Sequence, residues 1–434
     1  MKQVYQDWLI RTHHLLHVSL PLWLASFNTK ANHNLETHTL IFPADPQNPL
    51  GSMGDQAIFL GLIQLLRQQG NHKISILCYR TPKQDWPEVE FIQISPSFSG
   101  SAEFAKQLAN ATQYVFTGAD VVDGKYGARF VCQALSFAQF AVIQQKSAII
   151  TGFSFNTRPR QIIINALNRL SKAVAIHVRD PDSLQRFQHV CQHPANLVAD
   201  TAFSMAKAKL LPPEVEDWLA KVAKQNQLPV GININRHAFK AAVKRLGQQA
   251  FVDQVAAQLQ NLAQHHPLAY CFIVHDYKAQ AGDVELLTEL EQCLQQGLPQ
   301  GLQQADSGIT SLLLMSHQPA EIKAVCAKLS LVISARMHLA IASLGAGTPV
   351  LVVDYQDKFT GLLRHFELNE QAILSPDEFL SPKLQQQVAQ QLDQLEQSRN
   401  QIEQHLPQVM TLSARNLASG PSQQAMAVSR ARSG

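Results

Sequence analysis

Short apolar runs alternate with longer amphipathic stretches along most of the chain. In the first half the apolar runs are T-H-T-L-I-F-P, K-I-S-I-L-C-Y, E-F-I-Q-I, Y-V-F-T-G, S-A-I-I-T-G, A-V-A-I-H-V-R-D and N-L-V-A-D. Helical patterns lie between them at residues 56–69, 102–110, 129–145 and 160–170. Parallel strands covered by helices on both faces have this pattern. It predicts a doubly wound α/β domain.

The alternation stops at A-K-A-K-L-L-P-P-E-V-E-D-W-L and then begins again. Pro212 and Pro213 end one element and open the next helix, which predicts a domain boundary around residues 206–214. Five strand-like runs follow, in L-P-V-G-I-N-I-N, A-Y-C-F-I-V-H-D, S-L-L-L-M, L-V-I-S and P-V-L-V-V-D-Y. They predict a second α/β domain of five strands.

The expected organisation has five parts. An N-terminal arm covers residues 1–36, and two Rossmann-like domains cover residues 37–208 and 209–375. Residues 376–418 are Gln-rich, amphipathic and free of strand patterns, so we expect C-terminal helices there. Residues 419–434 are rich in Ser, Ala and Arg and are expected to be a disordered tail. Ligands of such domains bind at the carboxyl ends of the strands.

Composition narrows the class of protein. The 36 basic and 33 acidic residues give a net charge of +3, which argues against a nucleic-acid binder. The six cysteines show no C-x-x-C spacing, so we expect no disulfide framework and no metal site, and a reducing cytoplasm. The apolar run at residues 15–27 is short and interrupted by Pro21. It predicts an arm packed on the body, with weak contact to a membrane surface as the alternative.

Several predicted strands of the first domain end in polar residues. G-S-M-G-D, residues 51–55, either admits an anion at a helix N-terminus or forms a tight turn in which Asp55 starts the helix. The loop T-G-A-D-V-V-D-G-K-Y-G carries Asp120, Asp123 and Lys125, which either bind sugar hydroxyls and supply a base or form an Asx-stabilised turn. In H-V-R-D-P-D-S, Arg179 either faces a ligand or pairs with the neighbouring Asp180.

The second domain offers a similar set. Asn233 and Asn235 follow its first strand and could bind a hydroxylated or phosphorylated ligand. Arg336 and His338 lie in S-A-R-M-H, where a strand passes into a helix. A guanidinium matches carboxylate and phosphate geometry, and an imidazole exchanges protons near neutral pH. The alternative for this pair is a helix start with surface contacts only. Lys358 follows the next strand.

Four of these motifs together resemble the polysaccharide pyruvyl transferase family. They are G-S-M-G-D-Q-A-I, V-R-D-P-D-S-L, V-A-D-T-A-F and, most specifically, S-A-R-M-H-L-A-I-A-S-L-G-A-G-T-P-V-L-V-V-D-Y-Q-D-K-F. The chain has T-G-A-D where family members often carry G-G-G, and G-S-M-G-D where they often carry G-N-x-G-D. The resemblance implies a fold similar to GT-B glycosyltransferases, with two Rossmann-like domains facing a cleft.

The resemblance also implies an activity: transfer of pyruvate from phosphoenolpyruvate to two hydroxyls of a sugar, which forms a ketal in cell-surface polysaccharide biosynthesis. Residues 37–208 would then take the acceptor and residues 209–375 the donor. Arg336, Arg179 and Lys358 would bind the donor, His338 would be the general acid, and Asp55 or Asp120 would accept the hydroxyl proton. Acceptor binding would fall to Asp123, Lys125, Asn233 and Asn235. The chemistry needs no metal and no cofactor beyond phosphoenolpyruvate as co-substrate.

Two other interpretations stay open. One is a GT-B glycosyltransferase that uses a nucleotide sugar, and the other is a non-catalytic sugar-binding relative. The expected partners are phosphoenolpyruvate and a sugar, lipid-linked sugar or oligosaccharide acceptor, without nucleic acid, and a homo-oligomer is left open. We expect a cytoplasmic protein, with the inner face of the membrane as the alternative location.

Overall fold

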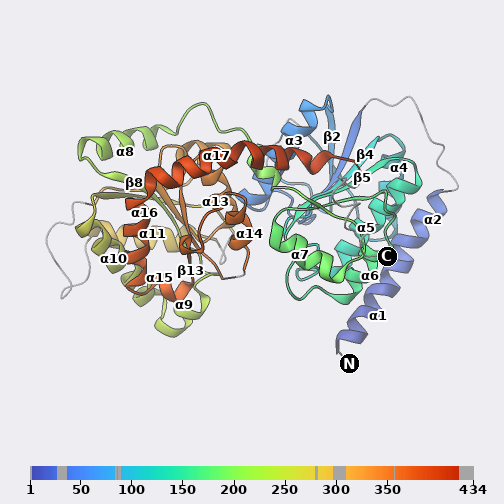
Figure 1. Cartoon of the computed structure of the whole chain (residues 1–434). Coiled ribbons are helices and arrows are strands. Elements are labelled where there is room, and N and C mark those ends of the chain that lie inside the picture. Colours follow the sequence, from blue (N-terminus) through green and yellow to red (C-terminus); the bar gives the residue numbers. More distant parts are fainter. Residues whose placement is uncertain are drawn as a thin grey trace. The chain divides into compact units, whose positions relative to one another are not determined.

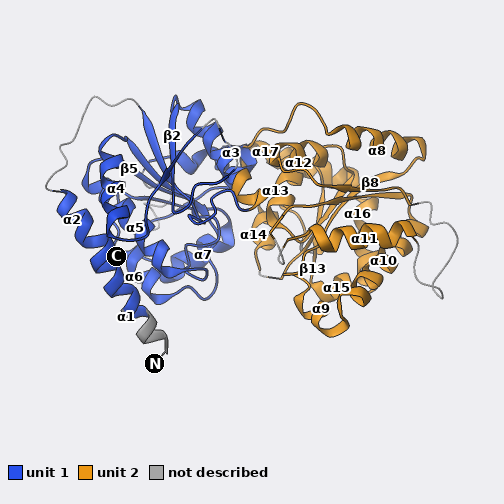
Figure 2. Ribbon diagram, turned by 180° about the vertical axis from the view of Figure 1, so that it is seen from behind, with its two compact units in different colours: residues 1–51, 58–204, 410–434 blue, residues 52–57, 205–409 orange. Residues whose placement is uncertain are grey.

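The computed structural model describes residues 2–26, 37–83, 86, 89–278, 282–296, 309–355 and 357–419. It contains two compact units, which Figure 2 colours separately. Unit 1 comprises residues 1–51, 58–204 and 410–434, and unit 2 comprises residues 52–57 and 205–409. The expected C-terminal helices are divided between the two units, because residues 410–434 belong to unit 1. Residues 52–57 belong to unit 2, and they contain the first turn of the helix that follows the first strand. Most of the predicted tail, residues 420–434, lies outside the described residues, as do residues 27–36 of the predicted arm.

Unit 1 is built on a parallel sheet of seven strands in the order β3-β2-β1-β4-β5-β6-β7. The strands are β1 (His38–Phe42), β2 (Lys73–Cys78), β3 (Glu90–Gln93), β4 (Gln113–Phe116), β5 (Ser147–Phe153), β6 (Ala175–Val178) and β7 (Asn196–Leu197). All seven correspond to apolar runs in the sequence. β1 and β4 are buried along their whole length, because helices cover both faces of the sheet. The winding direction reverses between β1 and β4, as in a Rossmann fold.

The helices that follow these strands are α3 (Met53–Gln68), α4 (Phe98–Ala109), α5 (Ala128–Ile143), α6 (Gln161–Arg169) and α7 (Pro181–Val190). Three elements precede β1: α1 (Lys2–His14), the π-helix η1 (Leu15–Ser19) and α2 (Leu20–Ser26). They pack on α4 and α5, as Figure 1 shows in blue and teal. The short 3₁₀ helices are η2 (Thr201–Ser204) and η4 (Arg415–Leu417). None of the described helices is long and apolar enough to cross a membrane.

Unit 2 repeats the same winding with six parallel strands in the order β10-β9-β8-β11-β12-β13. They are β8 (Leu228–Asn233), β9 (Leu268–Ile273), β10 (Ser311–Leu314), β11 (Leu331–Ser334), β12 (Val350–Val353) and β13 (Ile373–Leu374). The sequence predicted five strands, and this number was wrong. β13 has only two residues and pairs with the end of β12, so it leaves no apolar run. The winding reverses between β8 and β11.

The helices of unit 2 pack on both faces of this sheet. They are α8 (Pro213–Lys224), α9 (Lys240–Leu246), α10 (Gln248–His265), α11 (Val284–Gln296), α12 (Pro319–Cys326), α13 (Met337–Leu344), α14 (Phe359–Arg364), η3 (Glu370–Ala372), α15 (Pro376–Phe379) and α16 (Lys383–Asp393), followed by α17 (Leu395–Ala414). The prediction of two parallel α/β sheets with C-terminal helices is confirmed.

Candidate active site

The carboxyl ends of β8, β9 and β11 gather polar residues in unit 2. Arg336 and His338 follow β11, while His275 and Asp276 follow β9. β8 lies between these two strands, and Asn233 is its last residue. Ligands of open α/β sheets bind where the winding reverses, and in unit 2 that point lies between β8 and β11. The structure therefore brings Arg336 and His338 to the expected edge of the sheet.

Arg336 is held by two carboxylates. Its Nε and Nη2 donate to Oδ1 of Asp283 at 3.2 and 2.6 Å, and Nη1 lies 3.2 Å from Oδ2 of Asp276. The Arg336 side chain keeps 17 % of its surface exposed, whereas that of Asp283 is fully buried. Burial opposes the charge on Arg336, but the Asp283 carboxylate outweighs it and raises the pKa of the guanidinium. Arg336 is therefore charged, rigidly oriented and partly accessible.

Asp283 is fixed in turn by its other oxygen. Oδ2 accepts from Nδ2 of Asn233 at 2.9 Å and from the backbone N–H groups of His275 and Asp276 at 3.1 Å each. Burial raises the pKa of Asp283, although Arg336 and these donors act in the opposite direction. Asp283 is not among the site residues predicted from the sequence. The only local signal was an acidic residue directly before the helical pattern V-E-L-L.

His338 lies in the first turn of α13, whose N-cap is Arg336. The imidazole packs tightly against Gly54 in the first turn of α3, a turn that is part of unit 2. A Cβ atom built on Gly54 would lie 2.4 Å from Nδ1 of His338. Ser52 caps this helix end: its hydroxyl accepts from the Asp55 N–H at 3.1 Å and donates to the Asp55 carboxylate at 2.6 Å. The G-S-M-G-D motif is therefore both a capped helix start and a wall beside His338.

His275 is a second imidazole at this edge. Its side chain is buried. Burial, and then the nearby charges of His338 and Arg336, lower its pKa well below the usual range. His275 is therefore neutral near pH 7, which distinguishes it from a cationic anion-binding group.

The remaining predicted residues of unit 2 have different surroundings. Asn235 is fully buried, donates from Nδ2 to the carbonyl of Ala335 at 3.1 Å and accepts from the N–H of Ala238 at 3.0 Å. It ties the ends of β8 and β11 together. Lys358 is half-buried at the N-cap of α14. Like Arg336, it follows a strand of the same sheet.

Arg179 lies in the interior of unit 1. Its Nη1 is 2.8 Å from Oδ2 of Asp200, and its Nε donates to the Ser154 hydroxyl at 2.9 Å. Both charged side chains are only 2 % exposed. The sequence named Asp180 as the alternative partner, but Asp180 instead caps α7 by accepting from the N–H of Ser183 at 2.7 Å. These contacts indicate that Arg179 has a structural role.

The loop after β4 holds the other candidates of unit 1. Asp123 is buried, accepts from the Lys125 N–H at 2.8 Å and accepts from the side-chain amide of Asn156. Burial is the main cause that raises its pKa. Asp120 is half-buried and Lys125 is exposed. The loop is thus an Asx-type turn in which Asp123 orients the backbone, while Asp120 and Lys125 lie nearer its surface.

No group of three or more His, Cys, Asp or Glu within the described ranges is arranged to hold a metal ion. The charged and titratable groups at this edge are Arg336, His338, His275 and the carboxylates of Asp276 and Asp283.

Comparison with known proteins identifies the family of this chain. The model of the family described as polysaccharide pyruvyl transferase matches residues 53–357, which is most of the chain and includes Gly54, Arg336 and His338. The chain belongs to the polysaccharide pyruvyl transferase family. This family member is therefore a transferase, and its family name links it to polysaccharide modification. A sequence comparison with the curated proteins found no match.

Solved structures show how widely the fold of this pyruvyl transferase family member is shared. A protein from Listeria monocytogenes assigned as a UDP-N-acetylglucosamine 2-epimerase is 12 % identical, with 88 % of this chain and 96 % of that chain covered and a TM-score of 0.50. The trehalose-6-phosphate synthase OtsA is 10 % identical, with 87 % and 96 % covered and a TM-score of 0.50. Such low identity shows the fold alone, which is the one shared with GT-B proteins: two units, each Rossmann-like.

Proposed function

We propose that this protein transfers pyruvate from phosphoenolpyruvate to two hydroxyl groups of a sugar or glycan and forms a pyruvate ketal. The observation that carries the proposal is the pairing of an oriented, partly accessible Arg336 with His338 at the switch point of the unit 2 sheet. Both residues lie in the most specific motif of the family. A carboxylate or phosphate needs a planar fork of donors, and a proton transfer needs a titratable group beside it.

The charges around Arg336 determine which groups are needed to bind the donor. Phosphoenolpyruvate carries a carboxylate and a phosphate, whereas two carboxylates already surround Arg336. One guanidinium therefore cannot neutralise the donor alone. In the proposal, the exposed part of Arg336 contacts the donor, and Lys358 with protonated His338 supplies further positive charge. Arg179 is left out, because it is buried against Asp200.

The reaction then proceeds in two steps. His338 gives a proton to the methylene carbon of phosphoenolpyruvate, while a sugar hydroxyl attacks C2, so that a methyl group and the first C–O bond form. The second hydroxyl then attacks C2 and phosphate leaves. Each hydroxyl loses one proton, so one proton resupplies the acid and the other leaves with phosphate. Asp55, next to Gly54 in sequence, is the proposed base for the first hydroxyl, and Asp120 is the alternative.

His275, Asn233, Asn235 and Asp283 have supporting roles in this scheme. The neutral His275 adds no positive charge and serves as a hydrogen-bonding group at the donor. Asn233 and Asn235 are fully buried, and their contacts position Asp283 and the loop before α13. We assign acceptor recognition to the loop of unit 1 that carries Asp120 and Lys125, with the buried Asp123 holding its conformation.

The biological setting is also part of the proposal. A pyruvylated sugar adds a carboxylate to a cell-surface polysaccharide, so we propose a role in exopolysaccharide biosynthesis. The acceptor is a free, lipid-linked or oligomeric sugar, and the reaction takes place in the cytoplasm or at the inner face of a membrane.

The test is direct. The purified protein is incubated with phosphoenolpyruvate and nitrophenyl glycosides of common hexoses and hexosamines, and the products are analysed by mass spectrometry and phosphate assay. We expect a mass gain equal to pyruvic acid minus water, with one phosphate released per product. In parallel, thermal-shift assays compare phosphoenolpyruvate with UDP- and CMP-sugars. Stabilisation by a nucleotide sugar, with no response to phosphoenolpyruvate, would favour a glycosyltransferase.

A further inference from the structure

The N-terminal elements α1, η1 and α2 form a segment with two different faces. One face is anchored to unit 1, because Ile10, Val18 and Leu22 are buried in the core. Polar contacts add to this: Nε2 of His14 lies 2.7 Å from the Ser136 hydroxyl on α5. The Ser101 hydroxyl of α4 donates to the carbonyl of His17 at 2.8 Å. The segment is therefore a fixed part of the surface.

The opposite face is apolar and exposed. Of the 14 exposed large hydrophobic side chains that the structure describes, six fall between residues 9 and 24: Leu9, Leu15, Leu16, Leu20, Trp23 and Leu24. Leu15 is 62 % and Trp23 is 58 % exposed. Single exposed leucines are ordinary, but a cluster on one helical segment marks an interaction surface. Leu9, Leu16, Leu20 and Trp23 also follow the spacing of one helical face.

Positive charge lies beside this apolar face. Asp7 is the one acidic residue between positions 1 and 26, and it is paired with Arg160 at 2.6 Å. Arg11 and Arg129 are exposed, and neither forms a salt bridge within the described part of the chain. Burial is the main cause that lowers the pKa values of His13 and His14, so near neutral pH the positive charge comes from the arginines.

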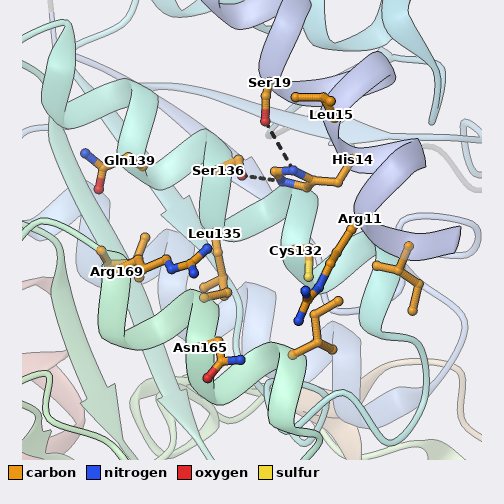
Figure 3. Close-up of a pocket in the computed structure, with 14 residues that line it drawn as sticks. Arg11, His14, Leu15, Ser19, Cys132, Leu135, Ser136, Gln139, Asn165 and Arg169 are labelled. Carbon is orange, nitrogen blue, oxygen red and sulfur yellow. Dashed lines mark hydrogen bonds between the residues drawn. The ribbon is translucent and has the colours of Figure 1, made fainter. Parts of the chain in front are cut away.

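A pocket of about 470 Å³ opens between this segment and helices α5 and α6. Figure 3 shows Arg11 and Arg169 reaching toward it from opposite sides, with His14 hydrogen-bonded to Ser136 and Ser19 at its rim. Much of the remaining lining is apolar, including Leu135. An anionic head next to an apolar wall is the chemistry of a phospholipid.

We propose that residues 2–26 form an interfacial membrane element that lies in the surface of an anionic bilayer. Leu16, Leu20 and Trp23 enter the boundary of the acyl chains, and a lipid phosphate binds beside Arg11 and Arg169. A helical segment with Trp and Leu on one face and basic residues at its edge binds membranes in this way without spanning them. The inference is independent of the pyruvyl transfer chemistry, and the segment precedes residues 53–357 of the family match.

The experiment measures co-sedimentation of the full-length protein with vesicles of phosphatidylcholine, alone or mixed with phosphatidylglycerol. We expect roughly 30-fold stronger binding to the mixed vesicles, because two arginines act near an anionic surface. The variant Leu20→Ser/Trp23→Ser should lose more than about tenfold of its binding. Arg11→Gln/Arg169→Gln should lose the preference for phosphatidylglycerol. Thermal unfolding checks that each variant is folded.

Matched controls use sites on unit 2. Leu210→Ser removes a leucine that is 79 % exposed, and Lys221→Gln/Lys224→Gln removes two exposed charges from α8, so both should bind vesicles like the wild type. The proposal is overturned if the wild type does not bind mixed vesicles or if Leu20→Ser/Trp23→Ser binds them equally well. It is also overturned if sedimentation shows that these two residues hold a protein dimer that ignores lipid.

Discussion

Replacing Gly54 by alanine tests the contact between the G-S-M-G-D motif and the proposed acid. The new methyl group would lie 2.4 Å from Nδ1 and 2.9 Å from Cγ of His338, whereas an ordinary contact begins at 3.4 Å. The difference of 3.4 − 2.4 Å means that the imidazole, or the first turn of α3, has to move by 1.0 Å. Gly54 is in a helical turn, so alanine itself causes no backbone strain.

Two effects of opposite sign determine how Gly54→Ala changes the free energy of unfolding. Alanine in place of glycine in a helix stabilises by up to about 1 kcal/mol. Overpacking a tight contact costs about 1–3 kcal/mol, so we expect Gly54→Ala to be net destabilising by about 1 kcal/mol. A catalytic group displaced by about 1 Å can cost about 100-fold in rate, which corresponds to about 2.7 kcal/mol in the barrier. We therefore expect a modest loss of stability and a large loss of transfer.

The assay is a double-mutant cycle with His338→Ala, read by urea unfolding and by pyruvyl transfer. In the His338→Ala background the ring is gone, so Gly54→Ala should become stabilising. That change of sign separates the specific contact from a general effect of alanine at this position. If Gly54→Ala is stabilising in the wild-type background and keeps full activity, the geometry on which the site rests is wrong.

Three further predictions concern charged and titratable groups. Arg336→Gln leaves the buried Asp283 without its cation and should destabilise by about 3–5 kcal/mol at neutral pH. This loss should shrink as the pH falls and Asp283 becomes protonated. Urea unfolding at several pH values measures the loss, and a loss that stays the same from neutral to acidic pH would contradict the prediction. His338→Asn should lower transfer by about 10²–10⁴-fold with an unchanged unfolding midpoint, and near-normal turnover would rule out the acid role. Burial lowers the pKa of His177 from 6.5 to about 4, so the unfolded chain takes up a proton first as the pH falls. Stability should therefore drop by about 3 kcal/mol between about pH 6.5 and pH 4, and His177→Gln should show a shallower slope in urea unfolding; equal slopes would count against this cause.

The strands could be predicted from the sequence because both faces of each sheet are covered. β1 and β4 are buried at every position, so their apolar residues are consecutive and easy to recognise. β13 could not be recognised, since two residues carry no periodicity. Its position is determined by pairing with β12, a contact that no local pattern records.

The site was predictable only in part, for the same physical reason. Arg336 and His338 stood out because polar residues interrupt an apolar pattern, but the partner of Arg336, Asp283, comes from a distant part of the chain. The partner of Arg179 also could not be identified from the local sequence. The adjacent Asp180 caps a helix, and the distant Asp200 forms the ion pair. Local sequence shows which residues are unusual, whereas charge pairing depends on the folded sheet.

The ion pair between Arg336 and Asp283 also changes how the predicted role of Arg336 in donor binding should be tested. The resemblance to the family assigned Arg336 to donor binding alone. The structure gives it a second role, because it compensates a fully buried carboxylate. A loss of activity in an Arg336 variant is therefore ambiguous, and His338 is the better position for testing the chemistry.

The most direct measurement of pyruvyl transfer is the isotope content of the product formed in deuterium oxide. Phosphoenolpyruvate and a sugar acceptor are incubated with the protein, and the ketal methyl group is analysed by NMR and mass spectrometry. If an acid group of the protein protonates the methylene carbon, each product molecule carries one deuterium in its methyl group, and His338→Asn forms almost none of this product. A ketal without deuterium, or a product formed from a nucleotide sugar and not from phosphoenolpyruvate, would contradict the account.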